Sequence, residues 1–382
     1  MFRFLTAGES HGRGLTAIVE GVPAGLPLDE DYIARDLVRR QGGYGRGGRM
    51  AIEHDRAEIL SGVRHGKTIG SPISLLIWNR DWGNWQDVMS ISPVEAAVEP
   101  LTRLRPGHAD LAGVMKYGLD DVRSILERAS ARETAIRVAV GAVARRLLQE
   151  FNIEVHSHTV AIGGIIAEIR GQIDWGRVED SPVRCVNGKV EKEMMAAIDG
   201  AKESGDSLGG IFEVIAFGVP VGLGSHVHWD RKLSGRIAQA IASINAVKGV
   251  EIGAGFVMAG LRGSQTHDII EATEQGRWRH KSNRAGGIEG GMTNGEPIVV
   301  RAAVKPIPTL AKPLPSVDLR SGEVVQAHYE RSDVCVVPAA GVVGEAMLAI
   351  VLADALLEKF GGDHVNETMR NYRAYTESIK LR

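Results

Sequence analysis

The chain has 382 residues, of which 44% are hydrophobic, and it carries 45 Lys and Arg against 47 Asp and Glu. This length and composition allow one large buried core, while the net charge of −2 argues against a broad basic surface for nucleic acid. The two cysteines, Cys185 and Cys335, are few enough to fit a protein of the reducing cytosol.

Hydrophobic spacing predicts a helix over 29–40, and its apolar side would be formed by Leu28, Ile33, Leu37 and Val38. Short strands follow over 58–63 and 73–78. A helix is then predicted over 109–118, before a stronger one that Ser130 opens and that runs to about Glu150. The pair Ser130 and Glu133 has the spacing of a capping box.

The second half alternates β-rich stretches, over 153–169, 208–222 and 250–262, with helices over 233–244 and 343–360. Polar and helix-breaking residues interrupt the apolar stretch 334–357, so we expect a buried strand and helix there and no membrane span. The helix-then-strand blocks 131–166 and 233–262 resemble each other, which indicates internal pseudo-symmetry. Because no Gly/Ser- or Pro-rich linker divides the chain, we expect one domain over 1–382.

The segment 39–49 places four arginines among five glycines. Glycine lets a backbone turn tightly around a ligand, and arginine offers forked donors to phosphate and carboxylate. The segment occurs once, between structured elements, unlike the repeated segments of disordered RNA-binding proteins. It therefore favours a site for a small, multiply anionic substrate.

Two histidines lie in loop sequences: His11 in Gly-Glu-Ser-His-Gly, and His108 after Arg105-Pro-Gly. Either histidine could act as an acid or a base near neutral pH, or could be an ordinary loop residue. Ser130 is expected to cap a helix whose free amides could also bind an anion. The neighbouring arginines, Arg128 and Arg132, would assist binding or be solvated surface charges.

A third cluster joins Lys305-Pro-Ile-Pro-Thr309 to Arg331-Ser-Asp333. A lysine before a rigid turn could hold a phosphate, and a buried Asp333 could relay a proton. The plainer interpretations are a surface turn and an ion pair. The histidine pairs at 156/158 and 226/228 lack a convincing third ligand, so we expect no metal site.

These segments together resemble the chorismate synthase family. The matching residues are 8–12, 21–25, 39–49, 105–110, 128–134, 245–249, 286–295, 305–309 and 331–333. They follow one another in the family's order and cover effectively the whole chain. The resemblance implies an α+β fold, with central helices sandwiched between antiparallel β-sheets, in a homotetramer.

The resemblance implies a carbon–oxygen lyase that converts 5-enolpyruvylshikimate 3-phosphate to chorismate. This anti-1,4 elimination of phosphate is the last common step of the shikimate pathway to the aromatic amino acids, and it requires reduced FMN without net oxidation. His11 would protonate the departing phosphate, His108 would serve the reduced flavin, and Asp333 would help to move the proton taken up at flavin N5. The substrate would be bound by Ser10, Arg40, Arg46, Arg49, Arg105 and Arg132.

By the same resemblance, FMN would lie against Arg128, Ala129, Ser130, Asn245, Ala246, Gly290, Lys305, Pro306, Ile307, Pro308, Thr309 and Arg331. Some family members reduce their flavin with NADPH, for which Arg40 and Arg46 are the candidate contacts. The chain has no extra segment for that purpose, so we expect an external flavin reductase. The expected location is the cytoplasm, without a membrane or nucleic-acid partner.

Three alternatives stay open beside this interpretation. The enzyme could be self-sufficient through NADPH, the chain could be a non-catalytic flavin- or phosphate-binding protein, or the Gly/Arg segment could belong to an RNA-binding module. The presence of His11, His108 and Asp333 favours catalysis over simple binding. The net charge argues against the RNA-binding module.

Overall fold

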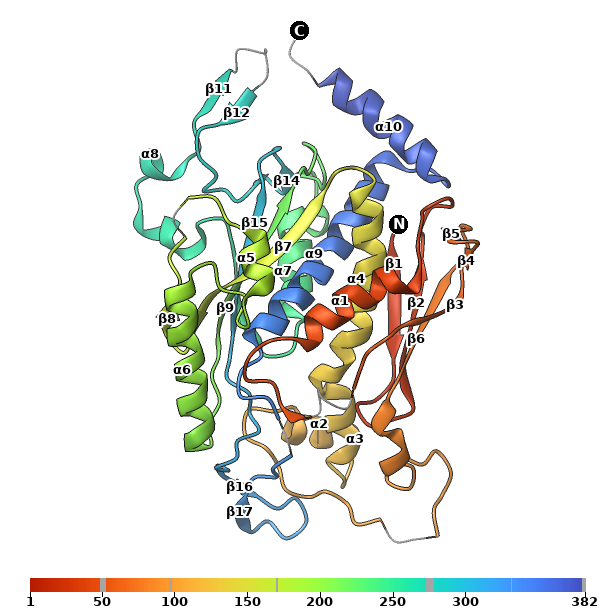
Figure 1. Ribbon diagram of the computed structural model, residues 1–382, viewed down its shortest axis with the longest axis vertical. Helices are drawn as coiled ribbons and strands as arrows, with labels where there is room; N and C mark the ends of the chain where they lie inside the picture. The colour runs from red at the N-terminus through yellow and green to blue at the C-terminus, as the bar shows by residue number, and fades with distance from the viewer. Residues whose placement is uncertain (49–52, 96–97, 170, 273–277, 331, 380–382) are drawn as a thin grey trace.

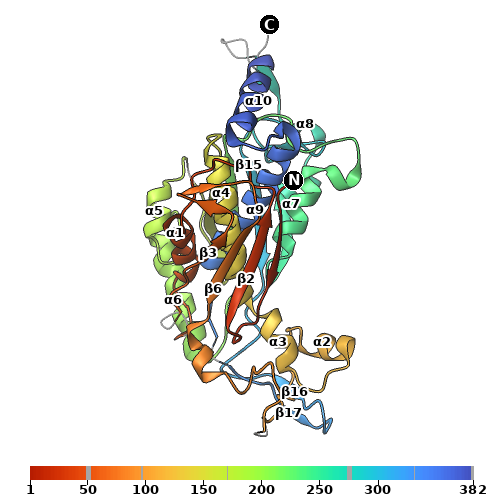
Figure 2. The same cartoon turned by 90° about the vertical axis from the view of Figure 1, so that its right-hand side faces the viewer.

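The structure is a computed structural model, and it describes residues 1–48, 53–95, 98–169, 171–272, 278–330 and 332–379. Two antiparallel sheets enclose a layer of helices (Figures 1 and 2). The first sheet has the order β1-β2-β6-β3, from β1 (Arg3–Ala7), β2 (Gly14–Glu20), β6 (Ile73–Trp78) and β3 (Glu58–Ser61). The second has the order β10-β15-β9-β7-β8, from β10 (Val247–Ile252), β15 (Ile298–Val304), β9 (Gly210–Phe217), β7 (Glu154–Ile162) and β8 (Ile165–Ile166).

The helices between and around the sheets differ widely in length. They are α1 (Glu30–Gln41), α2 (Asp110–Tyr117), α3 (Arg123–Ala129), α4 (Thr134–Gln149), α5 (Trp175–Asp180), α6 (Gly188–Ser204), α7 (Leu233–Ala242), α8 (Gly263–Thr266), α9 (Val337–Phe360) and α10 (Val365–Ser378). Short 3-10 turns are η2 (Arg80–Asn84), η3 (Ala131–Glu133), η4 (Trp229–Arg231) and η5 (Gly255–Gly260). Two-stranded ribbons pair β4 (Val63–Arg64) with β5 (Lys67–Thr68), β11 (Ile270–Ala272) with β12 (Trp278–His280), β13 (Ile288–Glu289) with β14 (Met292–Thr293), and β16 (Pro315–Val317) with β17 (Val324–Gln326).

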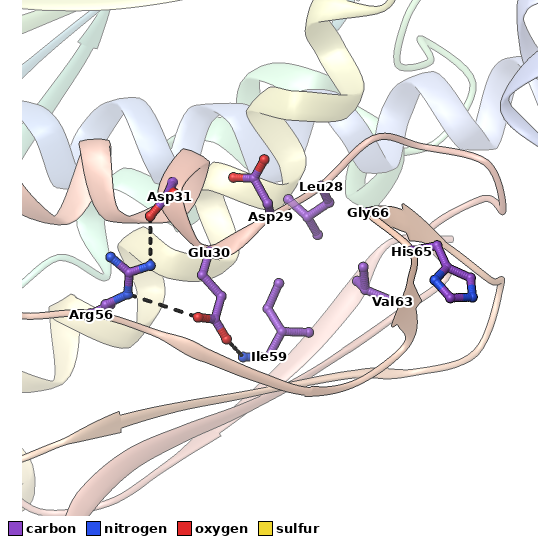
Figure 3. Close-up of a pocket in the computed structure, with 9 residues that line it drawn as sticks. All are labelled: Leu28, Asp29, Glu30, Asp31, Arg56, Ile59, Val63, His65 and Gly66. Carbon is purple, nitrogen blue, oxygen red and sulfur yellow. Dashed lines mark hydrogen bonds and ion pairs between the residues drawn. The ribbon is translucent and has the colours of Figure 1, made fainter.

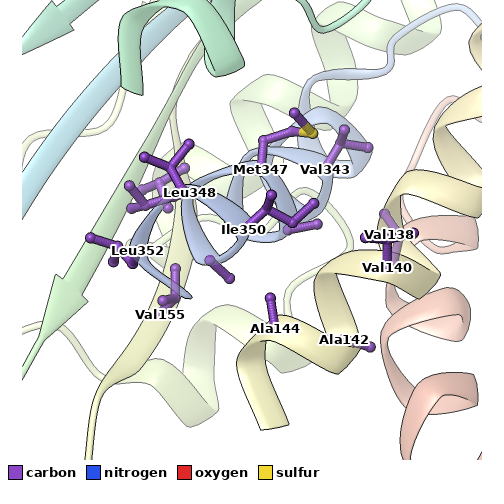
Figure 4. Packing of buried hydrophobic residues seen from close by; sticks show 14 of the residues in the cluster. Val138, Val140, Ala142, Ala144, Val155, Val343, Met347, Leu348, Ile350 and Leu352 are labelled. Atoms are coloured by element: carbon purple, nitrogen blue, oxygen red, sulfur yellow. The ribbon is translucent and has the colours of Figure 1, made fainter. Parts of the chain in front are cut away.

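Helices α4 and α9 form the centre of the sandwich and pack directly on each other (Figure 4). Their close approach requires Gly141, because a Cβ there would lie 2.3 Å from the Cβ of Ala346. On its other side α9 packs on β7 and β9. Among the described residues α9 is also the one helix long and apolar enough to cross a membrane, but 94% of its most apolar window is buried inside the protein. It is a core helix, and the predicted sandwich is confirmed.

The fold is pseudo-symmetric, although its repeat differs from the two blocks named above. The first sheet and its helices follow the order β1, β2, α1, β6, α4, and the second follows β7, β9, α7, β15, α9. The blocks 131–166 and 233–262 instead begin at helices from different places in this order, α4 and α7. The likeness of these two blocks therefore does not mark the repeat. Each block joins a helix to the strand that follows it, whereas the repeating unit is about half of the chain.

A short sequence repeat marks this symmetry. The pattern Gly-Val-Pro-x-Gly-Leu occurs at 21–26, after β2, and at 218–223, after β9. In each copy a threonine hydroxyl, of Thr68 or Thr293, accepts the leucine N–H and donates to the proline carbonyl at 2.6 Å. The same turn, closed by the same side chain, therefore leads from a sheet toward the helix layer in both halves.

Most of the predicted elements are confirmed, with shifted ends. The helix α9 begins at Val337, earlier than expected, because Pro338 occupies its first turn, where proline is well tolerated. Asp29 caps α1 through the N–H of Tyr32. Val38, expected on the apolar side of α1, is 64% exposed. The capping box predicted at Ser130 is half formed: Ser130 caps the 3-10 turn η3, while the Glu133 carboxylate pairs with Arg137.

Candidate active site

The candidate site lies where α4 and α9 begin. Figure 1 shows both N-terminal ends directed toward the part of the molecule that carries α2, α3 and the β16–β17 ribbon. The start of a helix carries partial positive charge and unpaired N–H groups, so it favours an anion. The loops gathered there contain most of the residues expected from the sequence.

His11 lies in the β1–β2 loop and is held by a carboxylate from α3. Its backbone N–H donates to Glu127 at 2.7 Å, and its ring Nδ1 lies 2.8 Å from the other carboxylate oxygen. The neighbouring Ser10 N–H donates to the Glu127 carbonyl. Trp85 stacks on the imidazole with ring centroids 3.8 Å apart. The loop is therefore fixed to α3, and the orientation of His11 is defined on two sides.

Glu127 is 1% exposed and is bound by two basic side chains. Burial raises the pKa of its carboxyl, but the hydrogen bond and charge of His11, with Arg123, bring the pKa below its usual range. Arg123 also donates to Glu330 at 2.7 Å and lies over the ring of Trp85. The contacts connect the His11 loop to the segment that ends at Asp333.

His108 has a comparable arrangement. Its Nδ1 makes a short hydrogen bond with Asp110, and Arg105 donates to the same carboxylate through Nε at 2.9 Å. Burial raises the pKa of Asp110, but His108 and Arg105 lower it by more, so the pKa falls to about 2. Arg105 also reaches the hydroxyl of Thr309 at 3.3 Å. Both predicted histidines are thus paired with buried carboxylates.

Two further predicted arginines are buried beneath the site. Arg132 donates to Asp55 at 2.6 Å and to Asn79. Arg40 donates to Thr134 and lies 3.6 Å from Asp55, and its Nη1 makes no hydrogen bond within the described residues. Burial lowers the pKa of Arg40 to about 10, and the charge of Asp55 opposes that effect. A buried donor without a hydrogen bond is available to an anionic ligand.

The Gly/Arg segment closes over a cavity of about 490 Å³. Arg46 pairs with Asp333 at 3.0 Å, and the Gly47 N–H donates to the same carboxylate at 2.6 Å. Gly45 must be glycine, because its φ is +84° and a Cβ would lie 2.8 Å from Ile198. The arginine side chain is only 11% exposed, so the segment is packed against the rest of the protein.

Several of the residues expected to bind FMN are in contact with one another. Asn245 donates to the Ala129 carbonyl at 3.0 Å, while its Oδ1 is buried without a hydrogen-bond partner in the described residues. Lys305 donates from its backbone to Ala246 and from Nζ to the Gly107 carbonyl at 2.5 Å. Burial, helped by Lys248, lowers the pKa of Lys305.

Several expected residues lie elsewhere or are placed differently. Gly290, in the turn between β13 and β14, lies beside the N-terminus of α7, whereas Asn245 follows the C-terminus of that helix. The fold therefore does not bring Gly290 to the other candidates within this chain. The Arg128 side chain donates hydrogen bonds to the carbonyls of Thr6 and Gly8. These contacts hold the His11 loop in place. Two predicted residues, Arg49 and Arg331, lie outside the described residues.

A second cavity, of about 410 Å³, opens beside the start of α1 (Figure 3). Its acidic side chains already have partners: Asp31 pairs with Arg56 at 2.6 Å, and Glu30 accepts the N–H of Ile59 at 2.9 Å. None of the residues predicted for the site lines it. The candidate chemistry therefore belongs to the first location.

Sequence reasoning missed the residues that hold the predicted ones. Glu127 directly precedes the matching segment 128–134, and Asp110 is the last residue of the segment 105–110. The sequence therefore offered both residues as candidates. Asp55, Asn79 and Trp85 carried no signal, because only the fold brings them to Arg132 and His11.

Comparison with known proteins gives a consistent result over the full length. The family model described as chorismate synthase matches residues 2–357. The chain is 59% identical to a chorismate synthase of Moorella thermoacetica, over 99% of this chain and 100% of the relative, and 57% identical to one of Aquifex aeolicus, over 99% and 98%. A solved structure titled as a crystal structure of chorismate synthase aligns with a TM-score of 0.81 at 48% identity, covering 99% of this chain and 98% of the other.

Proposed function

Because this chain belongs to the chorismate synthase family, we propose that it converts 5-enolpyruvylshikimate 3-phosphate to chorismate and phosphate by anti-1,4 elimination. It would act as a carbon–oxygen lyase in the shikimate pathway to the aromatic amino acids. The observation that carries the proposal is the site itself: two histidines, each bound to a buried carboxylate, lie among arginines where two helices begin.

The charge of the site suits this substrate, which carries one phosphate and two carboxylates. Arg46 and Arg105 would bind it by exchanging part of their present contacts with Asp333 and Asp110 for contacts with the ligand. Arg40 would use Nη1, which lies 3.6 Å from Asp55 and makes no hydrogen bond within the described residues. Arg132, bound to Asp55 and Asn79, would act mainly by its charge from below. Such charge-assisted hydrogen bonds are stronger than neutral ones.

The residues present fit reduced FMN as cofactor. The Oδ1 of Asn245, which has no hydrogen-bond partner among the described residues, can accept a ligand hydrogen bond, and Lys305 supplies a positive charge. Ala129, Ser130 and Ala246 would complete this side, together with the backbone from Pro306 to Thr309. When bound, the reduced flavin supplies transient electron density to the substrate and is recovered unchanged.

The protein's own residues would handle the protons. His11 would give a proton to the departing phosphate oxygen, and His108 would keep the hydrogen-bonding pattern of the reduced flavin. Asp333 would help to move the proton that the substrate ring loses. A carboxylate that already holds Arg46 and the Gly47 N–H would also link this proton transfer to closure of the Gly/Arg segment.

The experiment is an anaerobic assay of two mixtures, one with chemically reduced FMN and no NADPH, and one with oxidised FMN and NADPH. We expect chorismate with pre-reduced FMN alone, and none with oxidised FMN and NADPH. Formation in the second mixture would instead assign flavin reduction to this chain, with Arg40 and Arg46 as candidate NADPH contacts. Absence of chorismate in both mixtures would favour a non-catalytic binding protein.

The assembly and setting follow from the same proposal. We expect a homotetramer in the cytoplasm, supplied with reduced flavin by an external reductase. Sedimentation would test the tetramer, and complementation of the assay by a flavin reductase would test the supply of cofactor.

A further inference from the structure

The contact between Glu127 and His11 defines which ring nitrogen can transfer a proton. Glu127 accepts the backbone N–H of His11 with one oxygen and meets ring Nδ1 with the other, at 2.7 and 2.8 Å. An ionised carboxylate can only accept hydrogen bonds, so Nδ1 must carry a hydrogen. Nε2 is then the nitrogen that can release a proton while this contact is kept.

We propose that Glu127 is a positioning residue for proton transfer by His11, holding Nδ1 protonated so that Nε2 delivers the proton. In the step, the carbon–oxygen bond breaks with its electron pair on the phosphate oxygen, which takes the Nε2 proton. His11 becomes a neutral imidazole that still donates from Nδ1 to Glu127. The inference rests on the proposed function and adds the group that orients its acid.

The charges around His11 act in opposite directions. Glu127 places a negative charge against the imidazole, while Arg123 places a positive charge on the far side of the carboxylate. Trp85 stacks on the ring, and an indole face attracts a cation. The other described charged groups at the loop include Glu9, which lies over Gly12, Arg13, which ends the loop before β2, and Arg128, which is bound to loop carbonyls. Among the described groups, only Glu127 meets the ring with a negative charge.

Glutamine cannot replace this carboxylate. The two oxygens of Glu127 each face an N–H of His11, and a glutamine has one oxygen and one NH₂ group. If the amide oxygen accepts the backbone N–H, the NH₂ group meets Nδ1 and stabilises the tautomer with its hydrogen on Nε2. E127Q therefore removes the charge and reverses the tautomer, with almost no change in volume.

The second sheet contains a matched control. Glu213 is 2% exposed, lies 3.0 Å from His158 Nε2 and pairs with Arg301 at 2.5 Å. It repeats the histidine–carboxylate–arginine arrangement of Glu127 away from the predicted site. E213Q should therefore cost as much stability as E127Q without changing catalysis.

The test compares kcat and KM of E127Q, E127D, E213Q and E213D under the anaerobic assay. We expect E127Q to lose on the order of 10²-fold in kcat with KM within about threefold, as for loss of a general acid. E127D keeps the charge but is too short for both contacts, so its kcat should lie between wild type and E127Q. The Glu213 variants should keep wild-type kcat. Equal kcat for the E127D and E213D proteins would overturn the proposal, even if E127Q did not fold.

A second readout does not depend on turnover. Nitrogen-15 NMR of the His11 imidazole, in its neutral form, reports which ring nitrogen carries the hydrogen. We expect the hydrogen on Nδ1 in the wild-type protein and in E213Q, and on Nε2 in E127Q. An unchanged tautomer in E127Q would overturn the inference. The expected tautomers, found together with a wild-type protein that forms no chorismate, would reject the proposed function alone.

Discussion

The two candidate acid–base residues are each controlled by a neighbour. His11 is bound to Glu127 and His108 to Asp110, and both carboxylates are buried. Since the pKa of Glu127 and that of Asp110 are both lowered, the carboxylates are ionised at neutral pH. Each histidine therefore meets a fixed negative charge, which orients its ring before any ligand binds.

Replacing His108 by alanine should abolish most turnover and preserve the fold. The side chain is 16% exposed, and its loss leaves Asp110 still paired with Arg105, so the free energy of unfolding should fall by only about 1 kcal/mol. We expect kcat with reduced FMN to fall on the order of 10²-fold or more. Urea unfolding and the anaerobic assay measure the two quantities. Near-normal turnover would remove His108 from the mechanism.

Arg46 tests substrate binding at the Gly/Arg segment. The change R46A removes a charge-assisted contact worth about 1.5–3 kcal/mol, so substrate affinity should fall about tenfold or more. R46K should recover part of it, because an ammonium keeps the charge without the planar fork. Substrate titration of wild type, R46K and R46A measures the affinity, and their melting temperatures show whether the fold is affected. Unchanged affinity in R46A would make Arg46 a spectator.

The burial of Arg46 was not predictable. Its glycine neighbours offer no side chain to pack on, but the structure leaves it 11% exposed against Asp333. That contact joins residues 287 positions apart, and local sequence carries no signal for it. The histidines and arginines themselves could be named from the sequence because their motifs match a family; their partners could not.

At the scale of elements, α9 contains a buried charge. Glu345 is fully buried in that helix and accepts hydrogen bonds from Arg39, Arg145 and Arg184. Burial raises the pKa of its carboxyl, but the three guanidinium groups outweigh burial and hold the pKa far below its usual range. The cluster ties α1, α4 and the segment after α5 to the central helix.

E345Q should therefore destabilise the protein in a pH-dependent way. Because the folded pKa is depressed, the stabilisation by Glu345 is present above its unfolded pKa of about 4.3 and is lost as pH falls below it. At pH 7 the variant should unfold more easily by about 3–5 kcal/mol. Urea unfolding at pH 7, 5, 4 and 3 should show this gap narrowing below pH 5. A constant gap would show that Glu345 acts by packing and not by charge.

Replacing glycine by alanine should have opposite effects on stability at the crossing of α4 and α9 and on the exposed side of α6. G141A would place a methyl group 2.3 Å from Ala346, so overpacking should cost about 1–3 kcal/mol. G200A, in the exposed middle of α6, meets nothing within 4 Å and should stabilise by about 0.5–1 kcal/mol. Denaturant unfolding of both variants measures the contrast. A stabilised G141A would contradict the close helix crossing.

Elements with local signals could be predicted, and the others could not. The start of α1 is fixed by Asp29 and the end of α9 by Gly361, both typical boundary residues. Helices α6 and α10 were missed, although Asn187 caps the first. Each exposes about half of its side chains and buries only a few, namely Met194, Ile198 and Ala201 in α6 and Val365 and Thr368 in α10.

At the scale of the molecule, the repeat of two similar halves explains why the site lies where it does. Each half contributes a sheet and one long central helix, and α4 and α9 begin at the same end of the molecule (Figure 1). Two positive helix ends therefore face one site. The repeated Gly-Val-Pro-x-Gly-Leu pattern marks this symmetry in the sequence, whereas the two helix-then-strand blocks do not correspond to it. The sandwich itself was predicted only through the family resemblance.

This arrangement predicts cooperative binding of the two anionic ligands. Arg46 lies on the Gly/Arg segment and pairs with Asp333, and both residues are predicted to act on the bound ligands, so substrate should hold the segment closed over the flavin. We expect oxidised FMN alone to bind weakly and substrate to tighten its binding. Fluorescence titration of FMN with and without substrate measures this coupling. Equal dissociation constants would show that the two ligands bind independently.

A reduced flavin should be required for turnover and should not be consumed. The most direct measurement mixes the protein anaerobically with a small amount of pre-reduced FMN and a large excess of 5-enolpyruvylshikimate 3-phosphate, without NADPH. We expect chorismate and phosphate to form in equal amounts, far exceeding the flavin, while the absorbance spectrum of the flavin stays that of the reduced form. Product limited to the amount of flavin, with the flavin oxidised in step, would contradict this expectation.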